Sequence, residues 1–230
     1  MTVVRRICER LSYYLALLCF FASLGLIASS LITQQWIIAR VTNAKVIAKV
    51  EGSMHAGLFS GVRVLDWGLG VRVMPFSVLS ELQDSTSFFG RGYWLGTVSF
   101  TCFGMVFTIL AILLTIGSGV QRRSFLGTTP CGMHICNALG ILFLTGAALM
   151  FYYNYNEYMK ENVLLQAQLE AGFNTTDKAS LGYSFRLFVA AIVVLFCPSL
   201  LLHCFSAPPV TRQIHPDKNS MPRERIAHFY

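Results

Sequence analysis

The residues that could support metal or nucleophilic chemistry are histidines and cysteines, and their spacing fits neither kind of site. The five histidines are far apart and form no HExxH pattern; they are His55, His134, His203, His215 and His228. The chain has no CxxC pair, no zinc-type Cys/His spacing, and no GxSxG, Walker or dinucleotide-binding fingerprint. We therefore predict no catalytic residue, no metal site and no cofactor, and we expect that the protein is not an enzyme.

The cysteines fall inside apolar stretches or near their ends, and neither long hydrophilic loop contains one. They are Cys8, Cys19, Cys102, Cys131, Cys136, Cys197 and Cys204. A disulfide framework is therefore not expected. Cys8 and Cys204 lie near the predicted inner face, where acylation is an alternative, but free thiols are favoured because position beside a membrane is a weak acylation signal.

The composition indicates an integral membrane protein. Of the 230 residues, 54% are hydrophobic and 13% charged, and the charged fraction is about half that of a soluble domain. The net charge of +7 does not indicate nucleic acid as a partner, because the cations flank the apolar stretches and membrane topology accounts for them.

Four apolar stretches are long enough to cross a bilayer as helices, at residues 13–32, 93–117, 131–153 and 183–205. A helix rises 1.5 Å per residue, so about twenty residues cover the roughly 30 Å hydrocarbon layer. A cleaved signal peptide is the alternative for the first stretch, because 28–30 are small residues. The apolar pair Leu31-Ile32 follows them directly, so we favour a retained helix.

None of the four spans contains Asp, Glu or Lys. Proton relays and ion-coupled carriers need such groups within the membrane, so transport is disfavoured, although a narrow pore lined by uncharged groups stays open. Small or amide-bearing residues predict close helix contacts instead. The predicted helix-packing residues are Gly25, Ser29, Gly92, Gly96, Asn137 and Gly140.

The distribution of cations predicts the topology. The segments 1–12, 118–130 and 206–230 hold nine Lys and Arg in about fifty residues, whereas the loops 33–92 and 154–182 hold eight in about ninety. Positive charge concentrates on the cytoplasmic side of a membrane protein. Both termini are therefore predicted to be cytoplasmic, with the loops 33–92 and 154–182 outside the cell.

The large outer loop has the composition of a small antiparallel sheet. Strand candidates are 36–41, 45–50, 57–70 and 71–74, with Pro75 ending the last one and a short helix at 77–82. Glycines between the β-formers of 57–70 indicate bulges or close backbone approach. The predicted structural loop motif comprises Trp36, Gly57, Leu58, Phe59, Gly61, Trp67, Gly68 and Gly70.

The smaller outer loop carries a glycosylation signal. Asn174-Thr175-Thr176 is an N-glycosylation sequon, and it agrees with an extracellular position. Residues 157–170 in the first half of this loop are expected to extend the third helix.

The arrangement of four spans with a large first and a small second outer loop resembles the claudin-like superfamily, and within it the clarins. Claudins follow a Trp with Gly-Leu-Trp and two cysteines, whereas this chain lacks the cysteines. The motifs resembling clarins are Thr33-Gln34-Gln35-Trp36-Ile37, Gly57-Leu58-Phe59-x-Gly61, Gly68-Leu69-Gly70, the set Pro130, Gly132, Asn137 and Gly140, and Gly182-Tyr183-Ser184-Phe185. They run in the same order across nearly the whole chain.

Three departures from clarins narrow the branch. Some clarins carry a cysteine pair at positions corresponding to Asn43 and Trp67, and both cysteines are missing here. Arg186 replaces a Trp common in clarins, and the sequon lies in the second loop rather than the first. The resemblance therefore favours a cysteine-poor, clarin-3-like branch or an invertebrate clarin.

The resemblance implies a glycoprotein of the plasma membrane that organises membrane complexes, linked to actin-rich protrusions and sensory-cell structure. The partners expected are the lipid bilayer, other membrane proteins (adhesion proteins or channel subunits), and cytoplasmic scaffolds or actin linkers; a homo-oligomer is also open. Two alternatives remain at this point, an auxiliary subunit of an ion channel and a claudin-like junctional adhesion protein.

Overall fold

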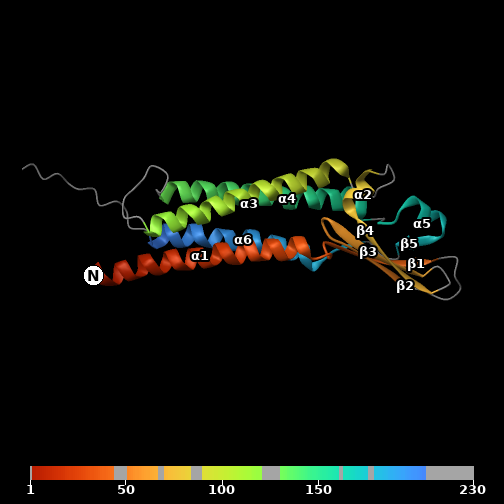
Figure 1. Cartoon of the computed structure of the whole chain (residues 1–230), viewed down its shortest axis with the longest axis horizontal. Helices are drawn as coiled ribbons and strands as arrows, with labels where there is room; N and C mark the ends of the chain where they lie inside the picture. Colours follow the sequence, from red (N-terminus) through yellow and green to blue (C-terminus); the bar gives the residue numbers. More distant parts are fainter. Residues whose placement is uncertain are drawn as a thin grey trace, which may run out of the picture.

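The structure is a computed structural model of the chain, and it describes residues 2–43, 51–66, 70–83, 90–120, 130–160, 163–175 and 179–205. Four long helices form the bundle: α1 (Thr2–Ile32), α3 (Arg91–Val120), α4 (Pro130–Asn154) and α6 (Tyr183–Phe205). Each is long and apolar enough to cross a membrane. Figure 1 shows them lying side by side along the longest axis.

The bundle consists of two close helix pairs, α1 with α6 and α3 with α4. Between α1 and α6, the Ser23 hydroxyl donates to the carbonyl of Ala191 at 2.9 Å. Between α3 and α4, the absence of side chains at Gly104 and Gly140 allows Leu144 and Thr108 to approach the opposite helix backbone. Small residues permit this close approach in lipid, where helices gain little from burying apolar surface against each other.

Four buried threonines line α3 without breaking it. Each hydroxyl donates to the carbonyl four residues earlier, at 2.7 to 2.9 Å, so all four buried hydroxyl donors have an acceptor. They are Thr97, Thr101, Thr108 and Thr115. This explains how a span can carry polar side chains and still be stable in an apolar environment.

A six-stranded antiparallel sheet lies beyond the end of the bundle opposite the labelled N-terminus (Figure 1). Its strands are β1 (Ile37–Asn43), β2 (Glu51–Ala56), β3 (Ser60–Asp66), β4 (Val71–Ser77), β5 (Phe173–Thr175) and β6 (Ser180–Leu181). The order is β4-β3-β2-β1-β5, and β6 pairs with the other half of β1. The predicted fold class, four spanning helices with a small antiparallel sheet, is confirmed, and the second loop also contributes to the sheet.

The two faces of the sheet differ in burial. Strand alternation places Ala39, Met54 and Leu65 on one face, and all three are buried. They belong to the same core cluster as Val78 of the short helix α2 (Val78–Gln83) and Phe173 of the second loop. The opposite face is more exposed, with Val71 and Val73 of β4 mostly uncovered.

Three local predictions need correction. Pro75 does not end the last strand, because β4 continues to Ser77. Residues 157–170 do not form one helix: a π-helical turn, η1 (Tyr155–Met159), follows α4, and α5 (Gln166–Glu170) is separate. The strand predicted at 45–50 lies entirely outside the described residues, and the described second strand begins at Glu51.

Candidate functional site

Trp36 lies where the sheet meets the bundle. Its side chain is completely buried, and its indole N–H donates to the Ser30 carbonyl of α1 at 2.7 Å. Its ring packs against Phe151 of α4 and against Phe185 and Phe188 of α6, with centroid distances of 4.6, 5.8 and 5.4 Å. One side chain therefore fixes the first strand to three of the four spanning helices.

The backbone around Trp36 joins the two outer loops. The N–H of Trp36 donates to the Ala56 carbonyl at 2.9 Å, and its carbonyl accepts from the N–H of Gly182 at 2.8 Å. The Ser184 N–H donates to the carbonyl of Gln35 at 3.1 Å. A Cβ at Gly182 would collide with that Gln35 carbonyl. The segments 33–37 and 182–185, both of which resemble clarins, thus contact each other.

Hydroxyl groups add a second set of contacts at this junction. Ser30 donates to the Ser184 carbonyl at 2.7 Å, and the hydroxyls of Thr33 and Ser184 lie 2.7 Å apart. Ser30 and Ser184 are both fully buried. Buried polar groups with partners stabilise one arrangement, because any other leaves them unpaired.

The turn at 57–60 connects the sheet to α3. The N–H of Gly57 donates to the Ser60 carbonyl at 2.8 Å, and Leu58 is buried. The indole N–H of Trp94 donates to the Leu58 carbonyl at 2.8 Å, which ties this turn to the first turn of α3. Phe59, the next residue, is 46% exposed.

Two glycines of the loop motif stand where side chains would collide with neighbours. A Cβ at Gly57 would lie 2.9 Å from the Thr33 carbonyl oxygen, and a Cβ at Gly61 would overlap the Phe76 ring. Neither glycine has a positive φ. Close approach, rather than unusual backbone conformation, therefore explains the glycines here.

The distal part of the loop motif is only partly described. Gly70 has a φ of +109°, a conformation that favours glycine, and its N–H donates to the Asp66 carboxylate at 3.2 Å. Trp67 and Gly68 lie outside the described residues. Their part in the loop motif therefore stays a prediction.

A buried ion pair between β3 and α2 was missed by the sequence analysis. The two terminal guanidinium nitrogens of Arg63 donate to the Glu81 carboxylate, at 2.5 and 2.7 Å. The guanidinium carbon lies 4.0 Å from the centre of the Phe76 ring. The side chains are only 5% and 10% exposed. The strand alternation could have revealed this, because it puts Arg63 on the same face as Gly61 and Leu65.

Some of the predicted helix-packing residues face another helix of the bundle, and others face away from it. Gly25 and Ser29 face away from the other helices: nothing lies within 4 Å of a Cβ at Gly25, and Ser29 is exposed. Their prediction as a contact within the bundle is corrected, because the buried face of α1 is the one carrying Ser23. Gly92 also faces open space, whereas Gly96 lies 3.7 Å from Met150 of α4.

Gly140 and Asn137 lie between helices. A Cβ at Gly140 would come within 3.1 Å of the Thr108 hydroxyl. The Asn137 amide donates to the Leu195 carbonyl at 2.9 Å and to the Ser199 hydroxyl at 2.8 Å. Both partners lie on α6, next to Pro198, whose missing N–H weakens the helical bonding there.

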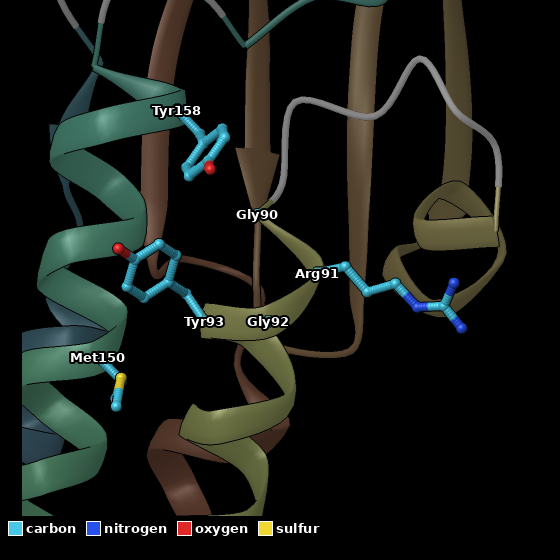
Figure 2. Close-up of a pocket in the computed structure, with 6 residues that line it drawn as sticks. All are labelled: Gly90, Arg91, Gly92, Tyr93, Met150 and Tyr158. Atoms are coloured by element: carbon cyan, nitrogen blue, oxygen red, sulfur yellow. The ribbon is translucent and has the colours of Figure 1, made fainter.

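A shallow groove opens at the outer ends of α3 and α4. Figure 2 shows Tyr93, Tyr158 and Met150 on one side of it, while the Arg91 side chain points away. Its volume is about 360 Å³. Beneath it, the Asn154 side-chain oxygen accepts the Gly90 N–H at 2.9 Å and so links the start of α3 to the end of α4. Such a groove, lined by aromatic and thioether side chains, suits lipid contact at the interface.

Other sequence-predicted features lie on the surface or in the spans. Asn174 is exposed on β5, at an edge of the sheet. The thiols of Cys19, Cys102, Cys136 and Cys197 are free. Within the described ranges, no group of three or more His, Cys, Asp and Glu side chains is arranged to hold a metal ion.

The comparisons with known proteins agree with this architecture. No protein-family model matches the chain. Human clarin-3 is 27% identical over 182 residues, which cover 76% of this chain and 78% of that protein. Mouse clarin-3 is 25% identical over 192 residues, covering 77% and 83%. These two similarities, each over about three quarters of the chain, support membership of the clarin family. Both clarin matches are to clarin-3, the branch that the missing cysteines favoured.

Proposed function

We propose that this clarin organises protein complexes in the plasma membrane, using the extracellular sheet and the outer faces of the bundle as binding surfaces. The cytoplasmic tail would connect these complexes to scaffolds or actin linkers. The clarin matches support a clarin-like membrane protein, and the link to actin and sensory-cell structure is part of this proposal.

The observation that carries the proposal is the rigid attachment of the sheet. Trp36 contacts α1, α4 and α6, and Trp94 of α3 binds the turn that contains Leu58. All four spanning helices therefore hold the sheet in one orientation. A rigid platform lowers the entropic cost of binding a partner, because little has to be ordered on association.

Organisation of complexes fits the chemistry of the spans better than transport does. The four spans contain no Asp, Glu or Lys. Asn137 is buried, and its amide donates to two groups of α6. These contacts give it a packing role, so the polar groups of the spans need no ion pathway to explain them.

Proximity labelling from the tail in polarised cells, followed by purification in mild detergent, tests the proposal. Recovery of actin linkers, adhesion proteins and scaffolds is the expected result. Recovery of one channel family at fixed stoichiometry would replace the proposal by an auxiliary-subunit function. A Trp36→Ala variant, whose sheet should lose its attachment, should lose the extracellular partners. It is compared with wild type at equal surface level, because a change at this junction can also impair folding.

We also propose that both termini are cytoplasmic and that Asn174 is glycosylated. Its exposed position on β5 leaves room for a glycan. An Asn174→Gln variant should migrate faster on a gel and become insensitive to glycosidase. Epitopes at the two termini should be detected only in permeabilised cells; detection at either terminus in intact cells would contradict this topology.

A further inference from the structure

The outer strand β4 leaves one edge of the sheet open. β4 is an end strand, and within the described residues nothing pairs with its outer side. Val71 and Val73 are 63% and 64% exposed. Natural proteins usually protect such edges with charges, bulges or short strands. Here the edge is seven residues long, and its exposed residues are the apolar Val71, Val73 and Pro75 together with Arg72 and Ser77.

The register shows which backbone groups face outward. The Val78 N–H donates to the Phe59 carbonyl, and bonded pairs in an antiparallel ladder alternate with non-bonded pairs. Arg72, Met74 and Phe76 therefore bond to β3. The backbone groups of 71, 73, 75 and 77 then point to the open edge.

Pro75 occupies a position of β4 whose backbone nitrogen points away from β3, where no N–H is needed for the ladder. Pro75 has no N–H to donate, and its nitrogen points outward, so the bonding between β3 and β4 is intact. A strand added at the open edge can still use the Pro75 carbonyl and both backbone groups of Val71 and Val73. Pro75 therefore limits where such a strand can bind without preventing it.

The opposite edge of the sheet is not equivalent. There β5 and β6 cover β1, and β5 carries the exposed Asn174 of the sequon. These short strands offer little backbone, and a glycan at Asn174 would shield them. Head-to-tail growth from β4 onto β5 of another copy is therefore disfavoured, whereas a contact of β4 with itself closes after two copies.

We propose that two copies of this chain pair through β4, antiparallel, about a two-fold axis at Val73. This inference rests on the proposed function and names a second copy as one partner of the sheet. In this register Val73 faces Val73 of the other copy, and Val71 faces Pro75. The added strand covers 71–75 and stops before α2 begins at Val78.

Charge selects this register over its neighbour. Centred on Val73, the pairing places Arg72 opposite Met74 of the second copy. A shift by two residues would place Arg72 directly opposite Arg72, and like charges facing each other across strands are destabilising. The two copies then bond through the Val73 backbone groups and from each Val71 N–H to the partner's Pro75 carbonyl.

A charge exchange at the axis tests the pairing with two differently tagged full-length copies in mild detergent. Val73→Lys copies should recover each other about fivefold less than the wild-type copies do, because like charges meet at the axis. Val73→Glu copies should behave the same way. A mixture of Lys and Glu copies should restore recovery to the wild-type level, since residue 73 faces itself. Equal recovery in all combinations, or no restoration in the mixture, would overturn the proposal.

Disulfide trapping in membranes provides an independent readout. Val73→Cys should give a covalent dimer on oxidation, because facing residues of a strand pair lie close enough for a disulfide. Arg72→Cys is the matched control: in this register its two copies lie diagonally, too far apart to bond. Wild-type chain reports any background from its native cysteines.

A dimer with Arg72→Cys but not with Val73→Cys would reject the register. Unchanged thermal unfolding of the Val73 variants shows that the fold is intact. Tail labelling separates the two proposals. Unchanged pairing of the Val73→Lys copies overturns the pairing and leaves the proposed function standing, whereas a wild-type chain that pairs but labels no actin linker, adhesion protein or scaffold overturns the proposed function.

Discussion

Two regions of the sheet, its junction with the bundle and its β4 edge, are built in opposite ways. At the bundle end, Trp36 is completely buried, and its indole and backbone groups have hydrogen-bond partners. At the β4 edge, Val71 and Val73 are mostly exposed, and their backbone groups point outward. The sheet is thus packed against the bundle at the Trp36 junction, whereas its β4 edge is unpaired within the described residues.

This difference separates the residues that stabilise the fold from those that are exposed for binding. Residues at the junction contact several elements at once, so a change there disturbs the sheet and the helices together. Residues of the open edge contact few neighbours, and surface changes of that kind usually alter stability by less than about 0.5 kcal/mol. Function through binding is therefore expected at the edge, and folding defects at the junction.

The largest effect is expected for Gly182→Val. Any Cβ at this position collides with the Gln35 carbonyl, so the hydrogen bonds of Trp36 and Ser184 to this region must break. The protein should be retained in the endoplasmic reticulum, as measured by surface biotinylation. Gly57→Val should behave similarly, because its Cβ meets the Thr33 carbonyl.

The control for this prediction is a glycine with free space around it. A Cβ at Gly92, near the start of α3, meets nothing within 4 Å. Gly92→Ala should reach the surface like wild type. Normal surface delivery of Gly182→Val would show that the hydrogen bonds of the junction can be broken without impairing folding. It would contradict the claim that folding defects are concentrated at the junction.

The next effect concerns the aromatic contact itself. Trp36→Ala should lower the free energy of unfolding by about 3 to 5 kcal/mol, the usual range for a fully buried large side chain. Trp36→Phe should lower the free energy of unfolding by less, because it keeps an aromatic ring in the core. It still loses the hydrogen bond to the Ser30 carbonyl. Thermal unfolding in detergent measures both.

Val71→Ala is the matched control on the open edge, since Val71 is 63% exposed. Its midpoint should stay within about a degree or two of wild type, because surface substitutions cost little. A larger loss for Val71→Ala than for Trp36→Phe would mean that the edge is part of the folding core.

Breaking the buried pair of Arg63 and Glu81 should cost about as much as removing the Trp36 side chain. Removing one partner leaves a buried charge without its counterion, which typically costs about 3 to 5 kcal/mol. Arg63→Met should therefore unfold at lower temperature than wild type. The double variant Arg63→Met with Glu81→Leu should recover most of the loss, because apolar side chains replace both charges. Failure of the double variant to recover would assign the loss to the Phe76 contact instead.

The architecture could be predicted from the sequence because spans and strands have strong local patterns. Runs of about twenty apolar residues specify the helices, and turn-forming glycines separate the strands. Pro75 was misleading because a proline ends an inner strand but fits an edge strand whose nitrogen points outward. Which strand lies at the edge is a property of the whole sheet and not of the local sequence.

Contacts between distant segments were harder to predict. The motifs at 33–37 and 182–185 were both noticed, but their contact depends on how the two outer loops fold together. The ion pair of Arg63 with Glu81 joins a strand to a separate helix, and a charged residue in a strand is usually assigned to the surface. Gly25 and Ser29 had suitable spacing, but spacing does not say which side of a helix meets its neighbours.

The smallest effect is expected for single hydrogen bonds, and it compares the junction with the middle of the bundle. Ser30→Ala removes the bond to the Ser184 carbonyl, and Asn137→Leu removes the bonds to Leu195 and Ser199. Side-chain hydrogen bonds between membrane helices contribute about 0.6 kcal/mol on average and at most about 2. Each variant should therefore lower the thermal midpoint slightly, and their losses should add, because the two sites share no partner.

If the loss for Asn137→Leu exceeded that of Trp36→Ala, the bundle rather than the junction would hold the protein together. A non-additive double variant would have another meaning, namely that α6 transmits strain between its two ends. α6 carries Ser184 at its outer end and both partners of Asn137 beside Pro198. A helix weakened at its proline can move its outer turn relative to the inner one. Additive losses would show that the two sites on α6 are independent, and that the sheet is anchored by contacts at its own end of the bundle.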